Sequence, residues 1–133
     1  MKMPRAFELR LTDLWKDTTK GLSGRMKKIV NDKVENHIKY RPYNSESLQG
    51  PLEGLWSYNK LETDNRIIFA ICKDCRERDL TSVNNCVGCE EISDNTIMLW
   101  AFGGHDIYAK LGRHRKKAWK KAKKRRRLKL RQR

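Results

Sequence analysis

Four cysteines have the types and spacing that most directly indicate a chemical site in this sequence. They form two pairs, Cys72-x-x-Cys75 and Cys86-x-x-Cys89, with ten residues between the pairs. Two such pairs on tight turns can supply four thiolate ligands to one Zn²⁺ ion. Gly88 lies inside the second pair and allows a tight turn there. We therefore predict one zinc ion, held by Cys72, Cys75, Cys86 and Cys89.

This zinc would be structural, because four cysteine ligands leave no coordination position for water or substrate. We expect it to hold together an inserted hairpin at residues 72–95, which is too polar to form a core of its own. Two disulfide bonds remain an alternative, as in the cytosol of hyperthermophiles. A redox pair is less favoured, because the sequence lacks the thioredoxin-like setting in which Cys-x-x-Cys opens a helix.

The basic residues form a second candidate site at the end of the chain. The formal net charge is +15, and residues 113–133 contain 14 Lys or Arg and no Asp or Glu. The first 112 residues then hold 17 basic and 16 acidic residues and are nearly neutral. Each cation that meets a phosphate releases a counterion, so such a tail can supply most of the affinity for RNA.

We predict that this tail binds RNA, and we expect it to form a basic helix against phosphates. Alternatives are a solvated tail or a localisation signal. A membrane surface is less favoured, because the tail has few large apolar residues. Trp119 could stack on a base or dock on the domain. The predicted RNA-binding residues are Arg113, Arg115, Lys116, Lys117, Trp119, Lys120, Lys121, Lys123, Lys124, Arg125, Arg126, Arg127, Lys129, Arg131 and Arg133.

Hydrophobic periodicity predicts the elements that must position these residues. Residues 4–11 alternate between apolar and polar and predict a first strand. A short helix follows over residues 13–22, capped by Thr12 or Asp13, and a longer helix covers residues 23–40. We interpret His37, beside the apolar stripe of the longer helix, as a histidine at the edge of the core. Three more strands are predicted at residues 55–61, 66–72 and 96–102.

The predicted fold class is α+β, with two N-terminal helices packed on an antiparallel sheet. The length of 133 residues suits a single domain. We divide the chain into a domain at residues 1–112 and a basic tail at residues 113–133. No apolar run approaches the roughly 20 residues needed to cross a bilayer, so we expect a cytoplasmic protein.

Three motifs in the second half of the chain indicate a family. They are Leu48-x-Gly50-x-Leu52-x-Gly54-Leu-Trp-Ser-Tyr58, Asn65-Arg66-Ile-Ile-Phe69 and Leu99-x-x-Phe102-Gly-Gly-His105-Asp-Ile-Tyr108. Together with the predicted order of strand, two helices and three strands, they resemble the RelE/ParE toxin superfamily. The resemblance implies a RelE-like fold over residues 4–112. The cysteine-containing insertion and the long basic tail depart from the compact family pattern.

The resemblance also implies an activity and its residues. RelE-like toxins cut mRNA on the ribosome by attack of a ribose 2′-hydroxyl group on the neighbouring phosphate. By position, Arg66 would bind the scissile phosphate, His105 would be the proton donor and Tyr108 would orient the mRNA base. Lys60 could be one of the additional basic residues. The first three residues also have ordinary interpretations. Arg66 could be a strand-end arginine, His105 a loop-capping histidine and Tyr108 an aromatic lid over the core.

Two functions from different classes therefore lead, and a nucleic-acid-binding regulator that uses the zinc hairpin for contact is a third. The first is a non-catalytic ribosomal or ribosome-associated protein, which would bind ribosomal RNA and ribosomal proteins through the basic tail. The near-neutral domain, the tail and the structural zinc favour it, and together they suggest an archaeal source. The alternative is a ribosome-dependent mRNA interferase toxin, whose partner would be an antitoxin. Neither function implies a small-molecule substrate.

Overall fold

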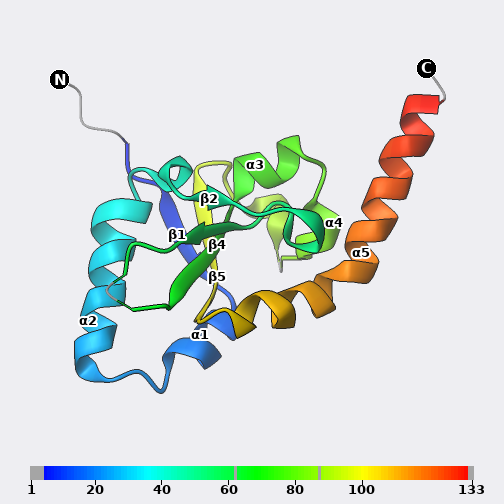
Figure 1. Cartoon of the computed structure of the whole chain (residues 1–133). Helices are drawn as coiled ribbons and strands as arrows, with labels where there is room; N and C mark the ends of the chain where they lie inside the picture. The colour runs from blue at the N-terminus through cyan, green and yellow to red at the C-terminus, as the bar shows by residue number, and fades with distance from the viewer. Residues whose placement is uncertain (1–4, 62, 87, 132–133) are drawn as a thin grey trace.

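The computed structural model describes residues 5–61, 63–86 and 88–131 of the chain, and side chains as far as residue 128. It forms one mixed sheet with helices on both faces (Figure 1). The spatial order of the strands is β1-β5-β4-β3-β2. Their bounds are β1 Glu8–Leu11, β2 Glu46–Ser47, β3 Trp56–Tyr58, β4 Arg66–Ile71 and β5 Thr96–Gly103.

The prediction of four strands is confirmed, and the short β2 is an addition. The prediction of a wholly antiparallel sheet was wrong, because β1 pairs with β5 in parallel. Leu9 faces Ile97 across this pair, and Leu11 faces Leu99. The first strand therefore inserts beside the last strand of the chain, and a long connection through two helices makes the parallel direction feasible. Pro4, where we placed the start of this strand, lies outside the described residues.

The two predicted N-terminal helices are both present. α1 covers Asp13–Thr19, and Thr12 caps it by accepting a hydrogen bond from the backbone N–H of Trp15. α2 covers Gly24–Lys33 and continues as a π-helical turn, η1, over Val34–Ile38. Short 3₁₀ turns follow at η2, Pro42–Asn44, and η3, Gly50–Leu52.

Each face of the sheet has its own apolar core. On one face, α2 and η1 cover the side chains of Ile67, Phe69 and Ile71 from β4. On the other face, α5, which covers Asp106–Arg131, buries Ile107 and Leu111 against Ile68. The prediction of two N-terminal helices packed on the sheet is thus confirmed, because α1 also contacts β5 and places Trp15 in the core under α2. The C-terminal helix adds the layer on the other face.

An irregularity in β5 decides which side chains reach which face. Along β4 and β5 the pairing shifts between Ile68, which faces Ala101, and Phe69, which faces Leu99. The extra residue is Trp100, and the shift has the character of a β-bulge. Beyond it, Phe102 joins the core under α2, and Ala101 joins the core under α5. The end of β5 is thereby set for the turn into α5.

The insertion at residues 72–95 differs from the predicted hairpin. It consists of two short helices, α3 at Cys72–Glu77 and α4 at Thr81–Asn84, and a 3₁₀ turn, η4, at Cys89–Glu91. The hairpin prediction was wrong because this segment lacks alternation. Its charged residues instead pair at helical spacing, as Asp74 does with Arg78 at 2.9 Å.

The boundary predicted at residue 112 falls inside α5, which is one helix from Asp106 to Arg131. Its first turns run below the sheet, and its later turns rise past α4 (Figure 1). Within the described part of the chain, no helix is both long enough and apolar enough to cross a membrane.

Candidate functional site

The structure brings together Arg66, His105 and Tyr108, the three residues that the family resemblance singled out. Nη2 of Arg66 lies 3.0 Å from Nε2 of His105. The guanidinium carbon of Arg66 stands 5.3 Å from the centre of the Tyr108 ring, and the His105 and Tyr108 rings meet edge to face at 6.0 Å. We call these three residues the Arg66 cluster. His105 and Tyr108 lie 39 or more positions after Arg66 in the sequence, so only the fold brings them to it.

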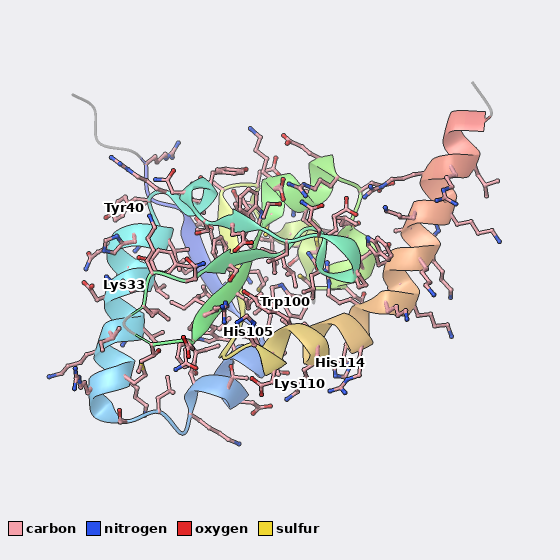
Figure 2. The ribbon with its side chains drawn as sticks, in the orientation of Figure 1. Lys33, Tyr40, Trp100, His105, Lys110 and His114 are labelled. Carbon is pink, nitrogen blue, oxygen red and sulfur yellow. The ribbon has the colours of Figure 1, made fainter. Side chains whose placement is uncertain are left out.

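Three elements position this cluster. Arg66 is the first residue of β4 and pairs with Gly103 at the end of β5. His105 follows two residues later, where β5 passes into α5 (Figure 2). A Cβ atom on Gly103 would lie 3.3 Å from Cβ of Ile107, so glycine lets the first turn of α5 approach the strand end closely.

Ser57 of β3 also belongs to this cluster, although the motifs did not mark it. Its hydroxyl group shares a hydrogen bond of 2.8 Å with the hydroxyl group of Tyr108. Ser57 is only 1% exposed, so this bond satisfies a buried polar group. It also fixes the Tyr108 ring below the guanidinium of Arg66. The pairing of β3 with β4, in which Ser57 faces Ile68, was the signal that could have placed Ser57 near the cluster.

The contact between Arg66 and His105 has a defined donor and acceptor. A guanidinium can only donate hydrogen bonds, so Nε2 of His105 is the acceptor when the two groups form a hydrogen bond. Arg66 donates a second hydrogen bond, of 2.9 Å, to the backbone oxygen of Asp64. Both contacts lie at the protein surface. A phosphate can therefore reach the guanidinium and the imidazole from solvent.

The four cysteines also come together, and they line one small enclosed cavity. All four are free thiols. Cys72 and Cys75 lie on α3, whereas Cys86 precedes η4 and Cys89 begins it. Among the described residues, no group of His, Cys, Asp or Glu already has the arrangement of a metal site. The cavity therefore gathers the predicted ligands without showing a coordination sphere.

The surroundings of the cysteines are largely apolar. Burial raises the pKa of the Cys75 thiol to about 11 and that of Cys86 to about 12. It also raises the pKa of Cys72. Without a bound cation, these groups are neutral thiols at neutral pH. Two polar side chains reach the sulfur atoms: Nδ2 of Asn84 lies 3.2 Å from Sγ of Cys75, and Nη2 of Arg76 lies 4.0 Å from Sγ of Cys89.

The basic helix divides into a docked side and an exposed side. Arg115, predicted to bind RNA, is 5% exposed and lies inside the protein. Its guanidinium faces the domain and not the solvent, because it donates to the backbone oxygens of Pro51 and Glu53 at 2.8 Å. Trp119 docks on the domain: its Nε1 donates to the Glu53 carboxylate at 2.9 Å. Arg126 pairs with the same carboxylate at 3.4 Å.

The other described basic side chains of the predicted tail, apart from Arg126, are exposed to solvent. Lys129, Arg131 and Arg133 lie outside the described side chains, so their predicted contacts have no structural account here. The exposed cations of the predicted tail, among the described side chains of α5, are Arg113, Lys116, Lys117, Lys120, Lys121, Lys123, Lys124, Arg125 and Arg127.

Sequence reasoning missed the docked stripe of α5. Ile107, Leu111, Arg115 and Ala122 are buried, and Ala118 packs beside them. Their spacing of three, four or seven residues is that of one helix face. This periodic signal was present, but it crosses the boundary that the change in charge suggested at residue 112.

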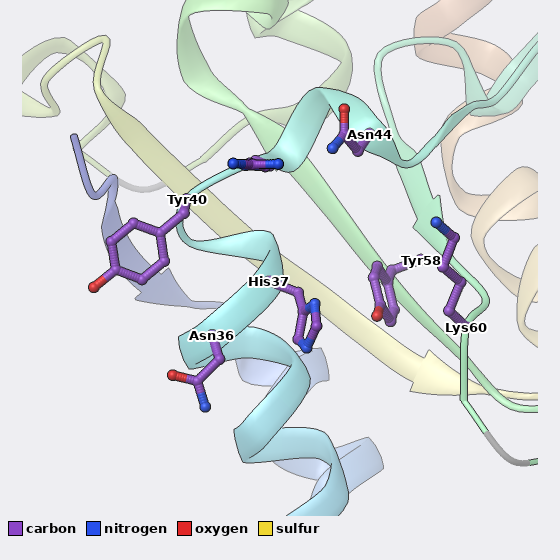
Figure 3. A pocket seen from close by; sticks show the side chains of 7 residues that line it. Asn36, His37, Tyr40, Asn44, Tyr58 and Lys60 are labelled. Carbon is purple, nitrogen blue, oxygen red and sulfur yellow. The ribbon is translucent and has the colours of Figure 1, made fainter. Parts of the chain in front are cut away.

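A cavity of about 530 Å³ lies between η1 and β3 (Figure 3). His37 and Tyr58 face each other across it, with ring centres 6.2 Å apart. Lys60 and Arg41 add cations to its lining. His37 was interpreted as a residue at the edge of the core, and the structure exposes it at this cavity. Lys60, the additional basic residue, lies here and contributes nothing to the Arg66 cluster among the contacts described.

Comparisons with known proteins bear on the fold. No family model and no curated protein matches this chain. Among solved structures, the chain is similar to one chain of the toxin–antitoxin complex RelBE2 from Mycobacterium tuberculosis, with a TM-score of 0.54 and 13% identity. The match covers 76% of this chain and 100% of that chain. At this identity the likeness concerns the fold alone, and it confirms that the chain has a RelE-like fold.

Proposed function

We propose that this chain is an RNA-cleaving toxin of the RelE type, with the Arg66 cluster as its active site. The single observation that carries this proposal is the meeting of Arg66, His105 and Tyr108 at the protein surface. The structural likeness to a chain of a toxin–antitoxin complex favours this function over that of a ribosomal component. Fold alone does not imply function, so the proposal depends on the geometry of the site.

The cluster suits attack by a ribose 2′-hydroxyl group on the adjacent phosphate. Arg66 would turn its guanidinium from His105 to two phosphate oxygens and stabilise the charge that accumulates there. Nε2 of His105, now free, would take up a proton from solvent. As the 2′-oxygen forms its bond to phosphorus, the bond to the 5′-oxygen breaks, and His105 donates its proton to that oxygen. The proton of the 2′-hydroxyl group passes to water.

Tyr108 would position the RNA. Its hydroxyl group is held by Ser57, so the ring keeps one orientation beside Arg66. An aromatic ring held in this way can stack on a base of single-stranded RNA. The exposed cations of α5 would add affinity for the RNA or the ribosome without reading its sequence. An antitoxin would be the natural protein partner, and we expect it to cover the Arg66 cluster.

The second candidate is a non-catalytic protein bound to ribosomal RNA. The concentration of exposed Lys and Arg on α5 favours it, because such a helix binds structured RNA by its phosphates and shape. Under this function the Arg66 cluster would be a structural contact. The zinc predicted from the cysteines is compatible with both candidates.

Cleavage of mRNA on purified ribosomes separates the two candidates. The proposal predicts cleavage by the unmodified chain and rates at least about 100-fold lower for His105→Ala and Arg66→Ala. The control variant Lys110→Ala changes an exposed residue of α5 and should cleave at the unmodified rate. All variants should sediment equally with ribosomal subunits, because each leaves the exposed cations at residues 113–127 of α5 in place.

Two results would overturn the toxin proposal. One is equal cleavage by the unmodified chain and His105→Ala. The other is no cleavage at all, combined with near-stoichiometric retention on one ribosomal subunit after a high-salt wash. The second result would establish the non-catalytic candidate instead. Expression without an antitoxin gives an independent test, since only an active toxin should arrest growth and only with His105 intact.

A further inference from the structure

A buried positive charge next to the four cysteines leads to a further inference. Arg115 is 5% exposed, and burial lowers its pKa to about 10. Burying a guanidinium is costly unless an anion compensates it. The hydrogen bonds that Arg115 donates go to two backbone oxygens and to Oδ1 of Asn84, all of them neutral acceptors. Its Nε has no hydrogen-bond partner among the described residues.

The nearest carboxylate does not supply this compensation by direct contact. Glu53 accepts hydrogen bonds from Trp119 and Arg126 through its two carboxylate oxygens. Arg115 donates its hydrogen bond to the backbone oxygen of Glu53 and not to the carboxylate. The other groups whose negative charge would stabilise the Arg115 guanidinium are the thiols of Cys75 and Cys86. Neutral thiols provide no such charge.

We propose that Cys72, Cys75, Cys86 and Cys89 bind one Zn²⁺ ion, and that this centre supplies the negative charge that holds Arg115, and with it α5, against the domain. Binding releases four protons from the thiols, so four thiolates and one Zn²⁺ carry a net charge of −2. That charge would lie beside the buried guanidinium. The inference does not depend on whether the protein cleaves RNA.

The residues around the cavity fit a zinc centre of this kind. Ala70, Ile92 and Met98 provide apolar walls that exclude water. Asn84 donates to Sγ of Cys75 at 3.2 Å through Nδ2, and it accepts from Arg115 at 2.7 Å through Oδ1. Amide donors to ligand sulfur atoms are a usual second layer around metal sites. Asn84 thus connects a ligand of the proposed centre directly to α5.

Arg76 provides a second cation on the opposite pair of cysteines. Its Nη2 donates to the backbone oxygen of Cys89 at 2.7 Å and lies 4.0 Å from Sγ of the same residue. Its Nη1 forms a close ion pair with Asp94. All four cysteines line this one cavity.

The coupling between the zinc and α5 must be reciprocal, and this makes it testable in the full chain. Metal analysis should find one zinc per chain. In Cys86→Ser, zinc should be lost, and amide hydrogen exchange over residues 113–122 should accelerate at least about tenfold. Exchange in β4 and β5 should change little, which shows that the variant remains folded. Conversely, Arg115→Met should weaken zinc binding at least about tenfold in competition with a chelator.

Two matched variants sharpen the test. Lys116→Met removes an exposed cation next to Arg115 and should leave both zinc affinity and exchange unchanged. Asn84→Ala should retain one zinc but accelerate exchange in residues 113–122, because it removes the connection and leaves the ligands. Unchanged zinc affinity in Arg115→Met, or unchanged exchange in Cys86→Ser, would overturn the coupling. A chain that contains no zinc, or that is lighter by the four hydrogens of two disulfide bonds, would overturn the metal site.

Discussion

The side chain of Tyr108 takes part in a hydrogen bond and in ring contacts, and their contributions can be separated. Its hydroxyl group bonds to the buried Ser57, and its ring lies below Arg66. Only the first of these is lost when the hydroxyl group is removed. The hydrogen bond to Ser57 connects β3 with α5, two elements that are distant in sequence, and contributes to the orientation of the ring.

We expect Tyr108→Phe to lower the free energy of unfolding by about 1 kcal/mol, because the buried Ser57 hydroxyl group loses its partner. Chemical denaturation measures this value. The double variant Ser57→Ala with Tyr108→Phe should lose less than the sum of the single variants, since both remove the same bond. Additive losses would show that the two hydroxyl groups do not interact.

At the scale of elements, the position of α5 depends on the loop around Glu53. Gly54 has φ = 92°, and a Cβ atom there would lie 2.6 Å from Cδ1 of Leu80. Gly112 lies within α5 and has free space where a Cβ atom would be. Gly54 is therefore required both by its backbone conformation and by the close approach of Leu80. Nothing in the packing requires a glycine at position 112.

Alanine at these two positions should have opposite effects. Gly112→Ala should raise the free energy of unfolding by about 1 kcal/mol, because glycine in a helix interior is unfavourable relative to alanine. Gly54→Ala should lower it by about 2 kcal/mol or more, because it combines a close contact with a left-handed backbone conformation. Thermal or chemical denaturation of the two variants decides. A stabilised Gly54→Ala would contradict the close packing of Leu80.

The docking of α5 should also depend on pH through Glu53. Burial raises the pKa of this carboxyl group, but the hydrogen bond from Trp119 and the charge of Arg126 outweigh burial and lower its pKa overall. A lowered pKa in the folded state means that the carboxylate stabilises the fold above the pKa of the unfolded chain. This contribution is lost as the pH falls through the lower folded value.

Glu53→Gln is the variant that isolates this contribution. The difference in unfolding free energy between the unmodified chain and Glu53→Gln should be about 1 kcal/mol at pH 7 and should shrink as the pH falls below the ordinary range of glutamate. Denaturation at a series of pH values measures it. A difference that stays constant down to low pH would show that the Glu53 charge does not hold α5.

At the scale of the whole molecule, most of the excess positive charge lies on α5, beyond the proposed catalytic site. Residues 1–112 are nearly neutral, whereas α5 presents a run of exposed Lys and Arg. The Arg66 cluster lies where α5 begins, and the exposed cations follow along the same helix. One helix therefore connects the site that would act on RNA with the surface that would bind it.

This separation makes the salt dependence of RNA binding predictable. Replacement by Gln of Lys116, Lys117, Lys120 and Lys121 should reduce the slope of log K against log salt by about 3, since each phosphate contact on single-stranded RNA contributes roughly 0.7. The control carries Gln at four exposed lysines near the other end of the chain, Lys16, Lys20, Lys27 and Lys28. Equal slopes for the two variants would mean that α5 is not the RNA-binding surface.

Much of this architecture could be predicted from the sequence, because local patterns carry it. Alternation and helical spacing predicted four strands and the two N-terminal helices, and the capping role of Thr12 followed from its residue type. The motifs around Arg66 and His105 predicted the RelE-like fold. The concentration of charge at the end of the chain was likewise a property of the sequence alone.

Other features were decided only by tertiary contacts. Residue type alone does not distinguish Arg115 from the lysines around it, and its burial follows from the positions of Pro51, Glu53 and Asn84. The bulge at Trp100 depends on the register between two strands. The composition of residues 113–133 favoured a separate arm, but burial of one face made those residues part of the domain helix. The sequence by itself determined which elements form and how much charge they carry, while long-range packing decided which of those charges meet the solvent.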